Sequence, residues 1–214
     1  MTMPALINKY REKVFVERLK QAYSIFSQAF LMAKQENGPA EFWDIGERAQ
    51  MEGSEKFYDI FAPYLKKAKS CRENAGCFAD RYITFSGKEY GYAPENRSVY
   101  AKGILNNGVS FALTSAGSGC SYSSGMQYSN ICAVLYVDLN ADALPNKSGV
   151  DYFGFYITKD GIRPMGFQGW DGGVNGYTCK YNGQSSGNGT GCTAWVLNNQ
   201  NMEYLYRDVS SQWQ

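Results

Sequence analysis

The chain has 214 residues, enough for one domain of ordinary size with a sizeable hydrophobic core. Its 21 basic and 20 acidic residues give a formal net charge of +1, so the net charge of the whole chain does not indicate binding to nucleic acid or to an anionic membrane surface. The chain contains no histidine, which excludes Ser-His-Asp and Cys-His relays and zinc sites built on imidazole. Hydrolases that use two carboxylates or a Ser-Lys pair stay open.

The first predicted element is a long amphipathic helix over residues 4–35, because apolar residues recur along it at intervals of three and four. An earlier apolar stripe of Ile7, Tyr10 and Val14 is offset by about one residue. A helix of this length measures about 45 Å at 1.5 Å per residue, too long for a small domain to cover, so we expect its first turns to project. The main stripe consists of Phe15, Leu19, Ala22, Phe26, Ala29 and Ala33.

The rest of the chain is predicted to add a second helix and an antiparallel sheet. The second helix covers residues 54–69, with Pro63 inside it as a bend. Short β segments separated by turns follow Cys71. The tail over residues 193–205 is apolar enough to pack on the core. The predicted strands are residues 81–85, 109–113 with Ile104, 132–139 and 152–158, and a turn at 159–161 leads into Ile162 and Arg163.

The six cysteines form three pairs that are local in the sequence, and each pair encloses a loop rich in Gly, Ser or Asn. An even number at short spacing favours disulfides in an oxidising compartment. Six cysteines allow about 15 connectivities, and we expect nearest-neighbour pairing because closing a short loop costs least. Free buried thiols or a metal site are the alternative, but no Cys-x-x-Cys sequence supports a zinc ribbon. The predicted pairs are Cys71 with Cys77, Cys120 with Cys132, and Cys179 with Cys192.

The first seven residues contain no charged region and no apolar run long enough for export. A disulfide-bonded protein must nevertheless reach an oxidising compartment. We therefore expect that a membrane-spanning or signal segment precedes Met1.

Several segments resemble one known group of proteins. Residues 1–6, with Pro4, are similar to the end of an apolar segment interrupted by proline, and residues 22–30 resemble the first turns that leave the membrane. The order of a long helix and a disulfide-stapled sheet also matches. The chain thus resembles type IV pilin-like proteins and type II secretion pseudopilins over nearly its whole length. Further similar segments are residues 43–46, 64–66, 104–111, 137–140, 151–155, 192–196 and 202–205.

The resemblance implies an α+β pilin-like fold in one domain, with the helix over residues 1–35 and a globular head over residues 36–214. It implies a structural subunit of a pilus or pseudopilus, not an enzyme, in the cell envelope outside the cytoplasm. The expected partners are other subunits, through the N-terminal helix, and the membrane, through the upstream segment; no nucleic acid is expected. The alternatives are a pilus-borne adhesin or carbohydrate-binding module, and a secreted two-carboxylate hydrolase using Asp138, Asp142, Asp151 or Asp171.

An acidic loop over residues 138–151 is the strongest chemical pattern in the sequence. Oxygen-bearing side chains alternate at its start, as loops that bind hard cations require. The resemblance adds weight, because some pseudopilins bind calcium in a loop. The loop departs from an EF-hand, with Ala143 in place of the turn glycine and Gly149 in place of the bidentate glutamate. An Asx-rich turn is the alternative. The candidate Ca²⁺ ligands are Asp138, Asn140, Asp142, the Leu144 carbonyl, Asn146 and Asp151.

Weaker patterns allow two interpretations each. Residues 167–173 are aromatic and glycine-rich, which suits a sugar-binding groove or a loop closed by its own side chains. The cations of the first helix form a solvated face or a collar near a membrane: Lys9, Arg11, Lys13, Arg18 and Lys20. A group of tyrosines makes filament contacts or covers the sheet: Tyr90, Tyr92, Tyr100, Tyr122 and Tyr128.

Overall fold

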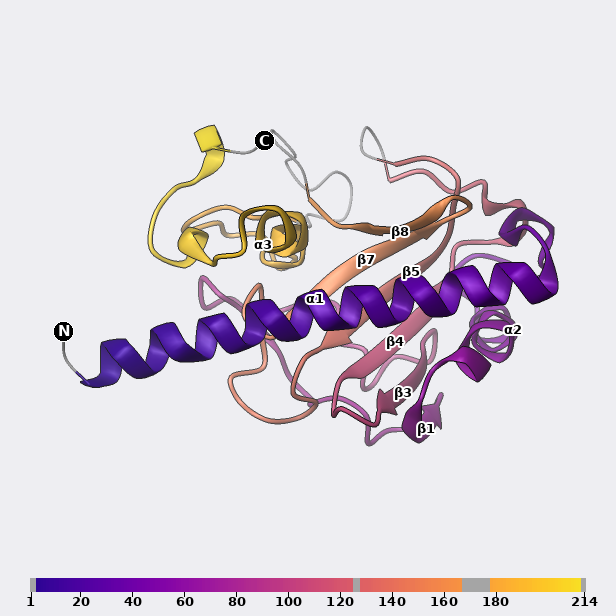
Figure 1. Cartoon of the computed structure of the whole chain (residues 1–214), viewed down its shortest axis with the longest axis horizontal. Coiled ribbons are helices and arrows are strands. Elements are labelled where there is room, and N and C mark those ends of the chain that lie inside the picture. Colours follow the sequence, from indigo (N-terminus) through magenta and orange to yellow (C-terminus); the bar gives the residue numbers. More distant parts are fainter. Residues whose placement is uncertain (1–2, 125–127, 167–177, 213–214) are drawn as a thin grey trace.

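The computed structural model describes residues 3–124, 128–166 and 178–212, with side chains from Leu6 onward. A long helix, α1 (Met3–Asn37), crosses one face of an eight-stranded sheet, and α2 (Met51–Phe61) lies beside it (Figure 1). A short helix, α3 (Thr193–Asn199), begins the C-terminal segment. The strands are β1 (Lys67–Arg72), β2 (Ile83–Thr84), β3 (Ala101–Leu105), β4 (Ser110–Ser115), β5 (Ile131–Asp138), β6 (Lys147–Ser148), β7 (Tyr152–Thr158) and β8 (Gly161–Pro164).

The sheet is mixed, whereas the sequence predicts an antiparallel one. Its strand order is β1-β3-β4-β5-β7-β6-β2, with β8 also paired to β7. The five pairings β1–β3, β3–β4, β4–β5, β5–β7 and β7–β8 are antiparallel. The pairings of β6 with β2 and with β7 are parallel. The two-residue strand β2 lies within the predicted strand over residues 81–85, whereas β6, also two residues long, is too short for the sequence to reveal.

The two faces of the sheet bury different side chains because successive residues of a strand point to opposite faces. Aliphatic residues and phenylalanines, such as Leu135 and Phe155, join the core beneath the helices. Tyrosines such as Tyr136 and Tyr152 lie in a second cluster on the other face. The loop tyrosines Tyr90 and Tyr100 are 3% and 4% exposed and pack edge-on against Tyr152 and Tyr136. Of the two predicted roles, filament contacts or covering the sheet, Tyr90 and Tyr100 therefore have the second.

Helix α1 is buried along its predicted stripe from Phe15 to Ala33 and exposed before it. Phe26 is completely buried and packs edge-on against Phe111 of β4, with ring centroids 5.6 Å apart. The 35 residues of α1 measure about 52 Å at 1.5 Å per residue, and the N-terminal end of the helix extends past the sheet (Figure 1). Leu6 and Tyr10 are 61% and 68% exposed. The predicted projection of the first turns is confirmed.

The predicted helix over residues 54–69 is wrong beyond Phe61. The α-helix ends there and a 3-10 turn, Ala62–Tyr64, follows. Pro63 explains the change, because its ring removes one backbone donor and clashes with the preceding helical turn. Residues 67–72 then extend as the edge strand β1 and pair with β3.

The predicted covalent links and the predicted docking of the tail are confirmed. Disulfides join Cys71 to Cys77, Cys120 to Cys132 and Cys179 to Cys192, and no described cysteine is free. In the tail, the largest side chains are buried in the core that also holds the α1 stripe. These tail residues are Trp195, Val196, Met202 and Tyr204.

Candidate functional site

The acidic loop begins and ends on neighbouring strands. Asp138 is the last residue of β5, and Asp151 directly precedes β7. The backbone N–H of Leu139 donates to the carbonyl of Asp151 at 2.8 Å, which closes the base of the loop. Both aspartates are completely buried. The two ends of the predicted site are therefore held together by the central strands of the sheet.

Every carboxylate oxygen of these two aspartates accepts a hydrogen bond. Asp138 accepts from the backbone N–H of Asn140 at 2.9 Å and from the hydroxyl of Tyr82. Asp151 accepts from the backbone N–H groups of Asn146 and Lys147, at 2.9 and 2.7 Å. The bond from Asn140 to Asp138 is that of an Asx-turn, and all but the Tyr82 bond join side chains of the loop to its own backbone, as the alternative interpretation predicts.

The hydrogen bonds do not remove the electrostatic cost of burying two like charges. Burial raises the pKa of Asp138 well above its ordinary range, and the nearby carboxylate of Asp151 raises it further. Burial likewise raises the pKa of Asp151 to about 6, although backbone N–H groups of Lys147 and Asn146 oppose the shift. In the described part of the chain, neither carboxylate takes part in an ion pair. At neutral pH the loop thus holds buried negative charge without a compensating cation from a side chain.

Two further oxygen atoms of the loop have no hydrogen-bond donor. The amide nitrogen of Asn140 donates to the carbonyls of Ala143 and Leu144, at 2.7 and 3.2 Å. Its Oδ1 atom is buried and accepts nothing, and the same holds for Oδ1 of Asn146. A buried acceptor without a donor is costly, and buried polar atoms in native proteins nearly always have a partner. Amide and carboxylate oxygens are ligands that Ca²⁺ prefers.

The six predicted ligands separate into two groups. Asp138, Asn140, Asn146 and Asp151 share one hydrogen-bonded network and supply buried oxygens. The carboxylate of Asp142 lies on an exposed residue, and the Leu144 carbonyl already accepts from Asn140 and, at 3.3 Å, from Arg11. Within the described ranges, no group of three or more His, Cys, Asp or Glu residues is arranged to hold a metal ion. The oxygens that fit a cation thus come from two aspartates and two asparagines.

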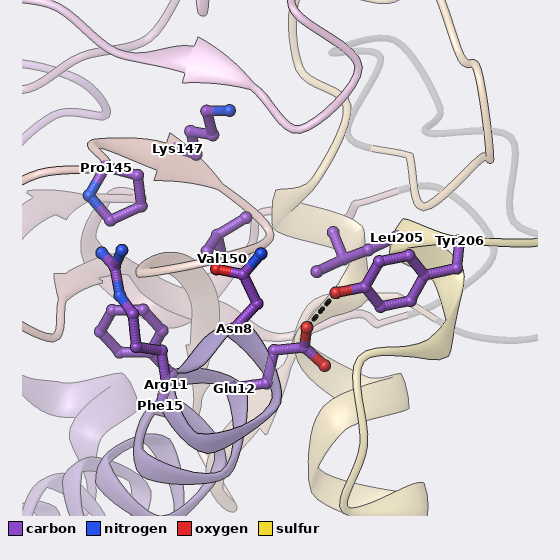
Figure 2. Close-up of a pocket in the computed structure, with 9 residues that line it drawn as sticks. All are labelled: Asn8, Arg11, Glu12, Phe15, Pro145, Lys147, Val150, Leu205 and Tyr206. Atoms are coloured by element: carbon purple, nitrogen blue, oxygen red, sulfur yellow. Dashed lines mark hydrogen bonds between the residues drawn. The ribbon is translucent and has the colours of Figure 1, made fainter. Parts of the chain in front are cut away.

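The N-terminal half of α1 contacts this loop and the C-terminal tail. Arg11 donates to the Leu144 carbonyl, and Glu12 accepts a hydrogen bond from the Tyr206 hydroxyl (Figure 2). Neither Arg11 nor Tyr82 was predicted to contact the loop, because no local pattern marks a contact between residues this far apart. A pocket of about 200 Å³ lies between the three segments and is lined by Asn8, Arg11, Glu12, Phe15, Pro145, Lys147, Val150, Leu205 and Tyr206.

The remaining predicted sites have different outcomes. The aromatic stretch over residues 167–173, including Asp171, lies outside the described residues. The hydrolase hypothesis needs carboxylates that a substrate can reach, and complete burial of Asp138 and Asp151 makes them poor candidates for that role.

Comparisons with known proteins place the chain in a family. None of the described helices combines the length and the hydropathy that crossing a membrane requires. The searches of curated proteins and of solved structures gave no match. Residues 5–205 match a family described as "Family of unknown function (DUF6613)". Because the match covers far more than half of the chain, the protein belongs to the DUF6613 family.

Proposed function

We propose that this protein is a structural subunit that works outside the cytoplasm and assembles with copies of itself through the exposed side of the second half of α1. The observation that carries the proposal is a pair of large apolar side chains that this half of the helix leaves exposed beside a hollow. Monomeric proteins rarely leave such apolar patches uncovered unless they serve binding. The two residues are Leu31 and Met32, which are 59% and 49% exposed.

A hollow beside the second half of α1 is a candidate binding site for a neighbouring copy. Its volume is about 470 Å³, and Ile25, Ala29 and Met32 form its helical wall at intervals of four and three residues. Leu105 and Tyr64 contribute to the opposite side. An apolar side chain from another subunit would fill this hollow as a helix fills a groove. Such a contact joins two different surfaces of neighbouring copies. When the rotation between neighbours does not close a ring, the contact repeats indefinitely and gives a filament.

Two further observations favour an assembly role outside the cytoplasm. Three disulfides indicate folding in an oxidising compartment. The resemblance of the sequence to pilin-like subunits points to the same class of function. A role in assembly needs no catalytic group, which agrees with a chain that has no histidine.

The test is incorporation into surface filaments. In cells that make the protein from its own gene, Leu31→Asp and Met32→Asp should each remove it from the sheared filament fraction without changing its total amount. Gln184→Asp is the matched control, because it places the same charge on an exposed position in the loop closed by the Cys179–Cys192 disulfide and not on α1. Wild-type protein that never enters sheared filaments, or aspartate variants that enter them like the control, would refute the assembly role.

As a second function, we propose that the acidic loop binds Ca²⁺ through Asp138, Asn140, Asn146 and Asp151. The support is specific: two buried carboxyl groups with raised pKa values lack a cationic partner among the described residues, and two buried amide oxygens lack a donor. A bound divalent ion would neutralise the charge and take up the amide oxygens as ligands. It would also fix the loop that contacts Arg11 of α1.

Calorimetric titration and thermal unfolding of metal-stripped protein test this binding. Saturating calcium at 100 times its dissociation constant should add about 2.7 kcal/mol to the free energy of unfolding, a rise of several degrees in Tm. Asp138→Asn should abolish the rise in Tm. Its side-chain oxygen can still accept from the backbone N–H of Asn140, and its amide nitrogen can donate to the hydroxyl oxygen of Tyr82. Asp160→Asn, at an exposed turn after β7, should behave like wild type. Absence of both heat and a Tm shift in wild type would leave the loop as a plain turn.

A further inference from the structure

The first turns of α1 form an amphipathic surface that faces away from the rest of the protein. At about 100° per residue, its four apolar residues fall within an arc of about 100°. Phe15, Val16 and Leu19 lie on the opposite side of the helix and are buried in the core. We call the exposed arc the outer face. It consists of Leu6, Ile7, Tyr10 and Val14, which are 61%, 55%, 68% and 36% exposed.

Cations border the outer face on both sides. The same helical geometry puts Lys9 and Lys13, both exposed, along one edge. Arg11 lies along the other edge, where its guanidinium also donates to the Leu144 carbonyl at 3.3 Å. The single carboxylate of residues 6–14 belongs to Glu12, which turns to the C-terminal tail and accepts a hydrogen bond from Tyr206 (Figure 2). The whole-chain net charge of +1 hides this local excess of positive charge.

We propose that the outer face lies on an anionic lipid surface. A helix with an apolar arc flanked by Lys and Arg is the arrangement that binds at the boundary between headgroups and acyl chains. The apolar side chains enter the boundary, while the long basic side chains reach the anionic headgroups. Because α1 extends past the sheet, this end of the helix can approach a flat surface (Figure 1).

Charge favours a lipid surface over a second copy of the same face. Two outer faces packed together would bring the lysines along the edges of both copies, Lys9 and Lys13, into one interface, which is unfavourable. An anionic bilayer instead attracts each of these cations. Lipid binding by the outer face does not depend on assembly through Leu31 and Met32, so each can fail without the other.

Vesicle flotation with the 214-residue protein tests the inference. The protein should float with phosphatidylcholine vesicles that contain phosphatidylglycerol, it should not float with phosphatidylcholine alone, and high salt should weaken the binding. The double variant Lys9→Glu/Lys13→Glu should bind the anionic vesicles at least about tenfold more weakly. Lys66→Glu/Lys88→Glu changes the net charge equally at two exposed positions elsewhere and should bind like wild type.

A second arm tests the apolar contribution. Tyr10→Asp should also lose binding, whereas Leu31→Asp, on the other half of the same helix, should keep it. Circular dichroism should give equal melting curves, because all these side chains are exposed. Three results would overturn the inference: no preference of wild type for anionic vesicles, equal loss in the control variants, or a dimer in solution that Tyr10→Asp separates while vesicle binding is absent.

Discussion

The hydroxyl of Tyr82 donates a hydrogen bond to the carboxylate of Asp138, and the two side chains are 1% and 0% exposed. Tyr82 also packs against Tyr152, with ring centroids 4.7 Å apart, and Tyr152 is the strand partner of Asp138 across β5 and β7. The carboxylate is therefore held between the tyrosine-lined face of the sheet and the acidic loop. Asp151, at the other end of the loop, adds a second buried negative charge.

This burial predicts that the stability of the metal-free protein falls as the pH rises from about 4 to above 6. The pKa of Asp151 is raised to about 6 and that of Asp138 is also raised, whereas both aspartates titrate near 3.9 in the unfolded chain. Between these values the folded state binds more protons than the unfolded state, so raising the pH favours unfolding. No histidine adds its own titration in this range.

Scanning calorimetry of metal-stripped protein measures the effect. The Tm should be higher at about pH 5 than at about pH 7.5, and Asp138→Asn should reduce the difference because it removes one of the two coupled charges. The control is Asp160→Asn, whose exposed position should leave the pH dependence unchanged. A Tm that increases between the two pH values would show that the aspartates are not destabilised by burial.

Replacing an aromatic residue by alanine should lower the free energy of unfolding very differently in the two halves of α1. Phe26→Ala removes a completely buried ring that packs against Phe61 and Phe111, so we expect a loss of about 3–5 kcal/mol in the free energy of unfolding. Tyr10→Ala removes a ring that is 68% exposed and should change stability by less than about 0.5 kcal/mol. Urea denaturation measures both. Similar losses would mean that the first turns of the helix are covered.

Local patterns in the sequence identified the elements whose signal lies within a few residues. The 3.6-residue period identified α1, short β segments separated by turns identified β4, β5 and β7, and short spacing identified the three disulfides. The end of α2 was misjudged because Tyr64 and Leu65 continue the helical spacing of Phe57 and Phe61. As an edge strand of mostly polar residues, β1 shows no apolar alternation that would compete with that pattern.

The acidic loop was predictable in composition but not in geometry. The alternation of oxygen side chains marked Asp138, Asn140 and Asp142, and Asp151 was predicted as a further oxygen ligand at the end of the loop. Two features depend on contacts between distant residues: the Tyr82 hydrogen bond to Asp138 and the Arg11 hydrogen bond to the Leu144 carbonyl. Such contacts form only when the sheet has brought the segments together, so no window of the sequence contains them.

The three disulfides should contribute unequally to stability. The Cys179–Cys192 bond spans 13 residues and the Cys71–Cys77 bond spans 6, and a longer closed loop restricts the unfolded chain more. We expect Cys179→Ser/Cys192→Ser to lower the free energy of unfolding by about 3 kcal/mol and Cys71→Ser/Cys77→Ser by about 2 kcal/mol. Urea denaturation of the two double variants checks the order. The reverse order would indicate that native-state packing, and not chain entropy, dominates.

A buried pair, Lys102 and Glu95, should be energetically coupled. Lys102 is completely buried, its amine donates to the backbone carbonyl of Glu95 at 2.7 Å, and burial lowers its pKa while the charge of Glu95 opposes that shift. The Glu95 carboxylate accepts from the backbone N–H groups of Gly76 and, at 2.9 Å, Phe78. Glu95 thus anchors the segment after the first disulfide and also supplies the negative charge nearest to a buried amine.

A double-mutant cycle measures this coupling by urea denaturation. Glu95→Gln replaces one acceptor oxygen with a donor and removes the opposing charge, so we expect a loss of about 1–3 kcal/mol. Lys102→Met should also destabilise the fold, because it leaves the Glu95 carbonyl without its donor and the carboxylate without a countercharge. The double variant should lose at least about 0.5 kcal/mol less than the sum of the single losses, since each change removes part of the other's cost. Additive losses would mean that the two side chains are stabilised separately by their backbone partners.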